Sequence, residues 1–319
     1  MEYRKLISFG KSSYVVSLPK TWVRQNKLVK GDLIYIDERG QDLLLSKKEN
    51  EQKSNEKSQI INIDNKDLLH VAREVNSSYI MDNHTITLKG NSAKDNIKSL
   101  QNIFQNLIAL EIMEQTPDSI IAKDFLNIEE VAINELIRKM DIITRTMLKE
   151  TSESIIDDNY ENINNRDDDV NRLYFLVYRT VLYNLDNPSN ALKRFKLTPI
   201  NLLNLLFTGF YIEGIADEAR RTARYAKDAK INTKDKKKIQ GLIEEITSFY
   251  LETMKAVYNS DESLALELSN RKRDYIKKMD LVEKEKSDHH LINLIARMKR
   301  LISFIHSLGR IVYQGHHYP

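Results

Sequence analysis

From Asn127 to the end of the chain, the sequence is a succession of long amphipathic segments with few helix breakers. Glycine occurs in this region only at positions 209, 214, 241, 309 and 315, and proline only at 188, 199 and 319. Because apolar residues recur with the period of an α-helix and little interrupts them, the region is predicted to form a helical bundle.

Six helices are expected in this region, divided by capping and breaking residues. Asn127 and Asp158 begin the first two, each with a glutamate at the capping-box position, and Asn187-Pro188 stops the second. The other helices are expected at about 199–229, 233–259, 261–286 and 289–314. Two successive trios, over 127–230 and 231–315, indicate an internal duplication.

Residues 46–59, SKKENEQKSNEKSQ, contain no apolar side chain. Such a segment cannot contribute to a core, so 49–59 is predicted to be a flexible linker. Residues 60–118 are expected to form a small α/β connector. Strand character at 60–63 and 79–88 surrounds a helix at about 67–76, and a second helix is expected over about 93–114.

Residues 1–48 are predicted to form a small head in the order strand, strand, short helix, strand, strand. Two runs of β-branched and aromatic residues flank a turn at Gly10–Ser13, and a short helix starts at Pro19. Lys30-Gly31-Asp32 then turns the chain into the last two strands. Gly10-Lys11-Ser12 is not a phosphate-binding loop, because Lys5 stands where that motif needs a glycine.

Positive charge is concentrated in this head. Residues 1–30 carry seven Lys and Arg against Glu2 alone, a net charge of +6, whereas the whole chain is only +3. Such segregation is typical of a surface that contacts nucleic acid, because neutralised phosphates release condensed counterions. A solvated basic face on an ordinary small domain is the alternative that charge alone leaves open.

Composition argues against several classes of protein. The chain has no cysteine, which excludes disulfides, thiolate metal sites and thiol nucleophiles. No histidine stands in a Glu-x-x-His or His-Glu-x-x-His pattern, and no set of residues matches a known catalytic arrangement. An enzyme is therefore not expected. No signal core and no membrane-length apolar run is present, so a cytoplasmic protein without membrane insertion is expected.

The head resembles the AbrB family of transcription regulators, in the variant that reads S-L-P-K-x-W over 17–22, followed by a G-D turn before the third strand. The resemblance implies a β-barrel built from hairpins that two chains exchange. An obligate homodimer through the head follows, since so short a segment has too little core to stand alone. DNA is the implied partner, with contacts expected from Arg4, Lys5, Lys11, Lys20 and Arg24.

The helical region resembles the PhoU family, whose members are paired three-helix bundles that regulate phosphate uptake. Residues 134–141, 166–176 and 212–217 carry this resemblance. An AbrB-like head joined to PhoU-like helices resembles an archaeal AbrB–PhoU architecture of phosphate regulators. The implied fold class is α+β: a small swapped-hairpin β-barrel head, an α/β connector, and an all-α body of two consecutive three-helix bundles.

Glu213 and Asp217 lie four residues apart on the expected third helix. Their carboxylates share a face and repel each other by about 0.2–0.5 kcal/mol unless a cation neutralises them. PhoU-like proteins hold surface metal ions with E-x-x-x-D or D-x-x-x-D pairs at this place. The resemblance therefore implies a metal site at Glu213 and Asp217. The aspartate run 167–169 of the second helix could close this site, with Asp168 and Asp169 as the expected further ligands. Magnesium, manganese, iron and zinc stay open as the ion.

Two alternatives to the metal site also stay open. Arg220, Arg221 and Arg224 follow the acidic pair and could form a ladder of ion pairs with it. The aspartate run 167–169 could be a solvated charge run paired with neighbouring arginines. The last helix of the second trio has no carboxylate pair, so at most one half of a paired site is expected.

The leading hypothesis is a DNA-binding transcriptional regulator of phosphate uptake, whose helical body senses a metal, a metal–phosphate state or a protein partner. The alternative is a PhoU-like adaptor that restrains a phosphate ABC transporter or a kinase by protein contact and uses its head only to dimerise. A third class, a metal-dependent enzyme in the bundle, lacks candidate bases and nucleophiles.

Overall fold

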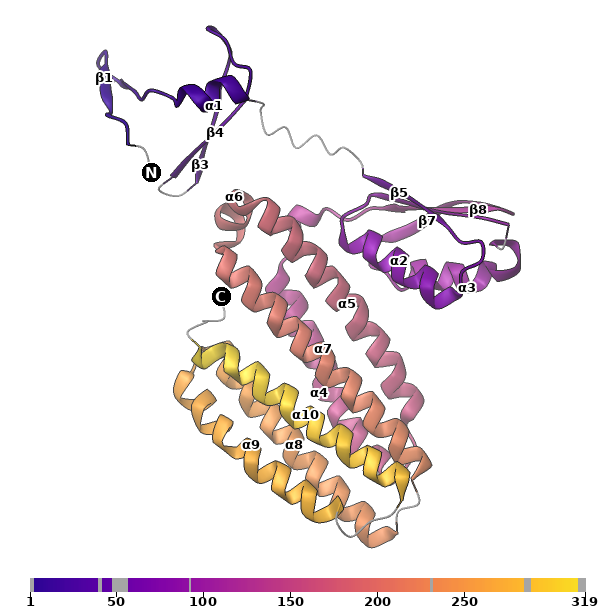
Figure 1. Cartoon of the computed structure of the whole chain (residues 1–319). Helices are drawn as coiled ribbons and strands as arrows, with labels where there is room; N and C mark the ends of the chain where they lie inside the picture. The colour runs from indigo at the N-terminus through magenta and orange to yellow at the C-terminus, as the bar shows by residue number, and fades with distance from the viewer. Residues whose placement is uncertain are drawn as a thin grey trace. The chain divides into compact units, whose positions relative to one another are not determined.

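The computed structural model describes residues 3–39, 42–47, 57–91, 93–229, 232–283 and 288–314. Backbone contacts divide the chain into two compact units, Met1–Asn55 and Glu56–Pro319, each of which is a separate body (Figure 1). Every helix in the described ranges lacks the length and the apolar character needed to cross a membrane.

The first unit has the expected order of elements. Its described elements are β1 (Ile7–Phe9), β2 (Ser13–Val15), α1 (Lys20–Gln25), β3 (Tyr35–Arg39) and β4 (Asp42–Ser46). The two hairpins form separate two-stranded antiparallel sheets. The β1–β2 turn uses Gly10 at φ +71°, a conformation that suits glycine.

The described residues of the head form no closed barrel in the single chain, and the expected barrel is one that two chains build by exchanging hairpins. None of the residues in 3–36 and 43–47 is buried. Leu33, Val29 and Phe9 are 75%, 71% and 70% exposed. Isolated two-stranded hairpins are marginally stable, and one copy of the head supplies no surface on which these apolar side chains could close a core.

The second unit begins with a four-stranded sheet in the order β5-β6-β8-β7. Strands β5 and β6 are parallel, and β8 pairs antiparallel with both β6 and β7. Two helices, α2 and α3, lie along the sheet (Figure 1), and Val75, Ile86 and Phe104 between these elements are 0% exposed. The bounds are β5 (Ser58–Asn62), α2 (Leu68–Ile80), β6 (Thr85–Lys89), α3 (Ala93–Gln105), β7 (Leu110–Thr116) and β8 (Ser119–Asp124).

The structure corrects several sequence-based predictions in this region. Helix α2 extends to Ile80, so the strand expected from residue 79 starts only at Thr85. The helix expected to reach residue 114 ends at Gln105, and β7 follows it. Its sequence LEIMEQT is rich in helix formers, but pairing with the unpredicted strand β8 outweighs that propensity. Ser58, expected in the linker, begins β5, and residues 48–56 of that segment lie outside the described residues.

The six expected helices of the body are confirmed, with small shifts at their ends. They are α4 (Ile133–Ser154), α5 (Tyr160–Asp186), α7 (Pro199–Asp228), α8 (Thr233–Asn259), α9 (Glu262–Glu283) and α10 (His289–Tyr313). The largest shift is at the first one: Asn127 precedes a 3-10 turn, η1 (Ile128–Glu130), and α4 starts only at Ile133. A short helix α6 (Pro188–Asn190) and a π-turn η2 (Ala191–Phe195) fill the break before α7.

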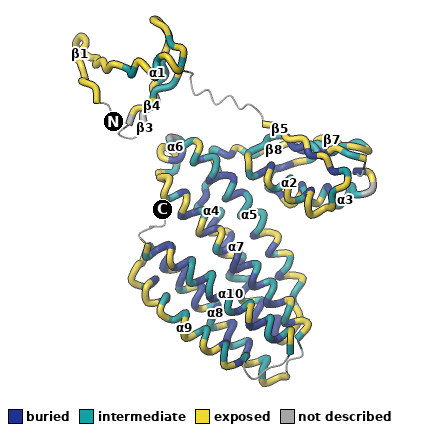
Figure 2. Tube along the Cα trace, viewed as in Figure 1, coloured by how far each residue is buried: buried dark blue, intermediate teal, exposed yellow. Residues whose placement is uncertain are grey.

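Helix α7 packs against α4, α5 and α10 (Figure 1). Two glycines permit this close packing. A Cβ at Gly209 would lie 3.2 Å from Ile137 of α4, and one at Gly214 would lie 3.1 Å from the ring of Phe304 in α10. Buried residues line the facing sides of all six helices (Figure 2), and they form one continuous core. The two predicted trios are therefore fused through α7–α10 and α4–α8 contacts.

Candidate functional site

The five cations expected to contact DNA are all exposed on the first unit. Arg4 and Lys5 precede β1, Lys11 lies in the β1–β2 turn, and Lys20 and Arg24 lie on α1. Exposed ammonium and guanidinium groups are the usual contacts to phosphate oxygens. The head thus offers cations from a strand start, a turn and a helix within one small unit.

The acidic pair on α7 meets a third acid from α5. Glu213 and Asp217 lie one turn apart, and Asp167 of α5 lies beside them. Arg220 Nη2 donates to Asp217 Oδ1 at 2.6 Å, and Arg220 Nε lies 2.9 Å from Asp167 Oδ2. Arg221 Nε lies 2.8 Å from the other oxygen of Asp217. The ladder of ion pairs is therefore present at Asp217, both of whose oxygens face a guanidinium.

Glu213 differs from Asp217 in having no ion pair among the described residues. Burial raises the pKa of Glu213 to about 7, and repulsion from Asp217 and Asp167 adds to the increase. Burial also raises the pKa of Asp167 to about 6; Arg220 opposes that shift and Asp217 adds to it. Burial is the main cause of both shifts and repulsion among the three carboxylates adds to it, so a bound cation would favour the ionised forms.

The structure brings Asp167, and not Asp168 or Asp169, to the α7 pair. Asp168 and Asp169 are exposed, and Arg172 Nη1 lies 3.7 Å from Asp169 Oδ1. Helix period explains the difference, because Asp167 shares the buried face of α5 with Ile163 and Val170. The spacing of Ile163, Asp167 and Val170 in the sequence already places Asp167 on that face. Neither the four residues predicted as metal ligands nor the set Asp167, Glu213 and Asp217 forms a group of three converging ligand atoms within the described residues.

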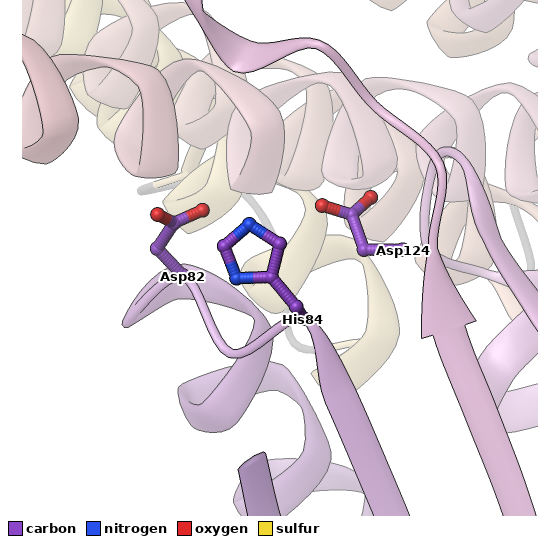
Figure 3. A group of neighbouring side chains, drawn as sticks. All are labelled: Asp82, His84 and Asp124. Carbon is purple, nitrogen blue, oxygen red and sulfur yellow. The ribbon is translucent and has the colours of Figure 1, made fainter. Parts of the chain in front are cut away.

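A different set of possible metal ligands lies where the sheet meets α5 (Figure 3). Asp82, His84 and Asp124 each offer an atom within 4.8 Å of the other two. The buried Nδ1 of His84 has no hydrogen-bond partner in the described part of the chain. Arg179 of α5, however, is 0% exposed, lies 2.6 Å from Asp82 Oδ1, and also contacts Asp124 Oδ2.

This donor set fits an ion-pair network better than a metal centre. A metal ion would need the carboxylate oxygens that Arg179 already holds. Burial alone lowers the pKa of Arg179, but the hydrogen bonds and charges of Asp124 and Asp82 outweigh it and raise that pKa. The ring of Tyr79 adds a cation–π contact, with its centroid 4.7 Å from the guanidinium carbon. The network joins the sheet to the helical body. Sequence reasoning missed it because β8, which ends at Asp124, was not predicted.

Two family models match the chain. One, described as "PhoU domain", matches residues 137–226, which span most of α4, all of α5 and most of α7. The other, described as "Antidote-toxin recognition MazE, bacterial antitoxin", matches residues 7–53. No curated protein and no solved structure matches the chain.

These matches identify a MazE/AbrB-like domain in the head and a PhoU domain over the first three long helices of the body, both of them regulatory types of domain. In this order they match an AbrB–PhoU fusion, as the sequence resemblance implies.

Proposed function

We propose that this protein is a homodimeric, DNA-binding transcriptional regulator of phosphate uptake, which acts in the cytoplasm. The observation that carries the proposal is the head. It is a MazE/AbrB-like domain, and its first 30 residues carry a net charge of +6 in a chain of +3. Its five candidate DNA contacts are exposed.

The exposed apolar residues of the head support the dimer. Ile7, Tyr14 and Ile36 are 59%, 69% and 63% exposed, although β-strands of this composition normally bury one face. A second copy that exchanges hairpins would cover these residues with residues of the same kind. The head would then present two equivalent basic surfaces, which suits an operator with two half-sites.

The helical body is the proposed sensor, with Glu213, Asp217 and Asp167 as the residues that would hold a cation. Magnesium, manganese, iron or zinc would give Glu213 the cationic partner that it lacks among the described residues. The ion would compete with Arg220 and Arg221 for the carboxylate of Asp217. Metal titration calorimetry of the wild type and of Glu213→Ala with Asp217→Ala tests this. The double variant should lose the binding heat. Equal uptake by both proteins would leave the ion-pair ladder as the only role of these residues.

DNA binding itself is tested by removing the head. Fluorescence anisotropy with DNA from upstream of phosphate-transport operons should show binding by the full chain and none by residues 57–319. Far-UV circular dichroism controls for folding of the shortened protein, whose helices all lie in the second compact unit. Unchanged affinity after truncation would rule out the head as the DNA-binding element.

The second candidate function is the adaptor, and one feature of α7 favours it. Residues 199–212 contain no charged side chain, yet Ile200, Phe207 and Phe210 are 55%, 50% and 43% exposed. Ile200 and Phe207 border an open groove, together with Tyr211 of α7 and Ile311 of α10. Exposed apolar patches of this kind commonly mark protein contacts.

The adaptor function predicts that Phe207→Asp weakens binding to the ATPase of a phosphate ABC transporter or to a phosphate-signalling kinase. DNA affinity should stay the same, because Phe207 lies in the second unit. Surface plasmon resonance with the purified partner measures the first effect. Full binding by the variant would remove the support that this groove gives to the adaptor.

A further inference from the structure

Four arginines gather where the C-terminal half of α7 lies along the N-terminal half of α10. They form an arginine cluster defined by Arg221, Arg224, Arg297 and Arg300. Three of the four share Glu218, whose Oε1 lies 3.0 Å from Arg300 Nε, 3.5 Å from Arg297 Nη1 and 4.0 Å from Arg221 Nη1.

The charges in this cluster do not balance. Glu218 is 1% exposed and is the carboxylate that Arg297 and Arg300 share. Asp217 also pairs with Arg221, but Arg220 occupies its other oxygen. Arg224 is exposed and has no carboxylate within ion-pair distance among the described residues. Guanidiniums stay charged at any physiological pH, so the cluster keeps surplus positive charge in a small area.

Tyr225 lies between arginines of this cluster. The guanidinium carbons of Arg224 and Arg297 lie 5.3 Å and 5.7 Å from the centroid of its ring. Hydrogen bonds from Arg297 and Arg224 lower the pKa of the Tyr225 hydroxyl, as expected where the local potential favours an anion. The ring of His290 also lies near Tyr225, with its centroid 6.4 Å from that of the tyrosine ring.

Arg297 and Arg300 are also held in position before any ligand arrives. Glu218 is buried and anchors two guanidiniums of α10 on α7. Tyr225 packs against one arginine from each helix. Fixed guanidinium forks match the oxygens of a phosphoryl group, which they bind in bidentate fashion, and preorganisation reduces the entropy lost on binding.

We propose that the arginine cluster is a binding site for a small phosphoryl oxyanion, either inorganic phosphate or the phosphates of a nucleotide. The site is compact: three of its cations converge on the buried carboxylate of Glu218, and the fourth, Arg224, lies against Tyr225. They do not form the extended track that a nucleic-acid backbone requires. The site is separate from the head and uses neither Glu213 nor Asp167, so its ligand class does not depend on what those groups bind.

Isothermal titration calorimetry of the full chain with inorganic phosphate and, separately, with ATP in the presence of a chelator tests the proposal. Wild type should show saturable binding to at least one of them, and the arm that binds identifies the source of the phosphoryl group. Arg224→Gln with Arg300→Gln should weaken it by about tenfold or more, because two charge-assisted contacts are lost. Arg271→Gln with Lys277→Gln on α9 removes the same charge and should leave affinity unchanged.

Arg224→Gln alone is a control for the case in which the double variant misfolds, since Arg224 is exposed and has no described ion pair. This single variant should still weaken binding. Absence of saturable binding in wild type with both probes overturns the proposal. So does equal affinity of wild type and the Arg224 variants. If neither probe binds while the double variant loses DNA affinity, the cluster is a DNA contact and not an oxyanion site.

Discussion

Arg179 in α5 donates from Nη2 to Oδ1 of Asp82, in the turn after α2, at 2.6 Å. Asp82 belongs to the connector and Arg179 to the helical body, so this pair fixes one to the other within the second unit. Asp124, which is 1% exposed, accepts from the same guanidinium nitrogen. The buried charge of Arg179 is tolerated here because Nε and Nη2 of its guanidinium pair with two carboxylates.

Arg179→Met should destabilise the second unit by about 3–5 kcal/mol, because it leaves Asp124 and Asp82 without their cation. Arg271→Met on α9 is the matched control; its partly exposed pairs with Glu252 and Glu267 should cost less than about 1 kcal/mol. Urea unfolding followed by circular dichroism measures both. Similar losses in the two variants would show that the network is no stronger than a surface ion pair.

Asp141 connects the two helical trios and provides a second stability test. Its carboxylate, 2% exposed on α4, accepts from the hydroxyls of Tyr250 and Tyr258 of α8, each at 2.9 Å. Tyr250→Phe removes one donor from a buried carboxylate and should cost about 1–3 kcal/mol. Tyr211→Phe is the control, since no hydrogen bond of its hydroxyl is described. Urea unfolding should separate the two variants, and equal effects would contradict a role for the Asp141 contacts.

Stability of the metal-free protein should depend on pH through Glu213. Its pKa rises from 4.5 to about 7 on folding, so the folded protein binds more protons than the unfolded chain between these values. Its contribution to stability is therefore fully present below about pH 4.5, declines as pH rises, and is lost above about pH 7.

The free energy of unfolding of the wild type should fall between about pH 5 and pH 7.5, and in Glu213→Gln this fall should be smaller by about 1–2 kcal/mol. Asp167 keeps part of the slope, because its pKa also rises. Thermal unfolding in a chelator over this pH range measures the effect, with the exposed Glu153→Gln as control. A variant that keeps the full slope would show that Glu213 ionises in the folded protein as readily as in the unfolded chain.

The helices of the body could be predicted from the sequence because each buries one face, and α8 was predicted at its observed bounds, Thr233–Asn259. β7 could not, since its local sequence favours a helix and only its pairing with β8 makes it a strand. The expected barrel is one that two chains build, and no described residue of the head is buried in the single chain.

Some site residues could also be predicted from local sequence patterns, and others could not. Glu213 and Asp217 follow from a four-residue spacing, and Asp167 follows from the phase of α5. The pair between Arg179 and Asp82 spans 97 residues, and no local pattern marks it. The same holds for Glu218 and Arg300, which come together only because α10 packs along α7.

Association of the head predicts that the full chain is a dimer at micromolar concentration. Phe9→Asp should shift it toward monomer, because Phe9, 70% exposed in the single chain, would be covered in the dimer. Leu281→Asp on α9, where Leu281 is 63% exposed, is the control and should leave the dimer intact. Sedimentation velocity measures all three proteins. A monomeric wild type would contradict the exchange of hairpins.

The salt dependence of DNA binding tests the central claim most directly. Each phosphate that the head neutralises should contribute about −0.9 to the slope of log affinity against log salt. Lys11→Ala and Arg24→Ala should each weaken binding and make the slope shallower by about 1, whereas Lys277→Ala on α9 should change neither. If the head variants bind with the affinity and the slope of the wild type, the head is not the surface that contacts DNA.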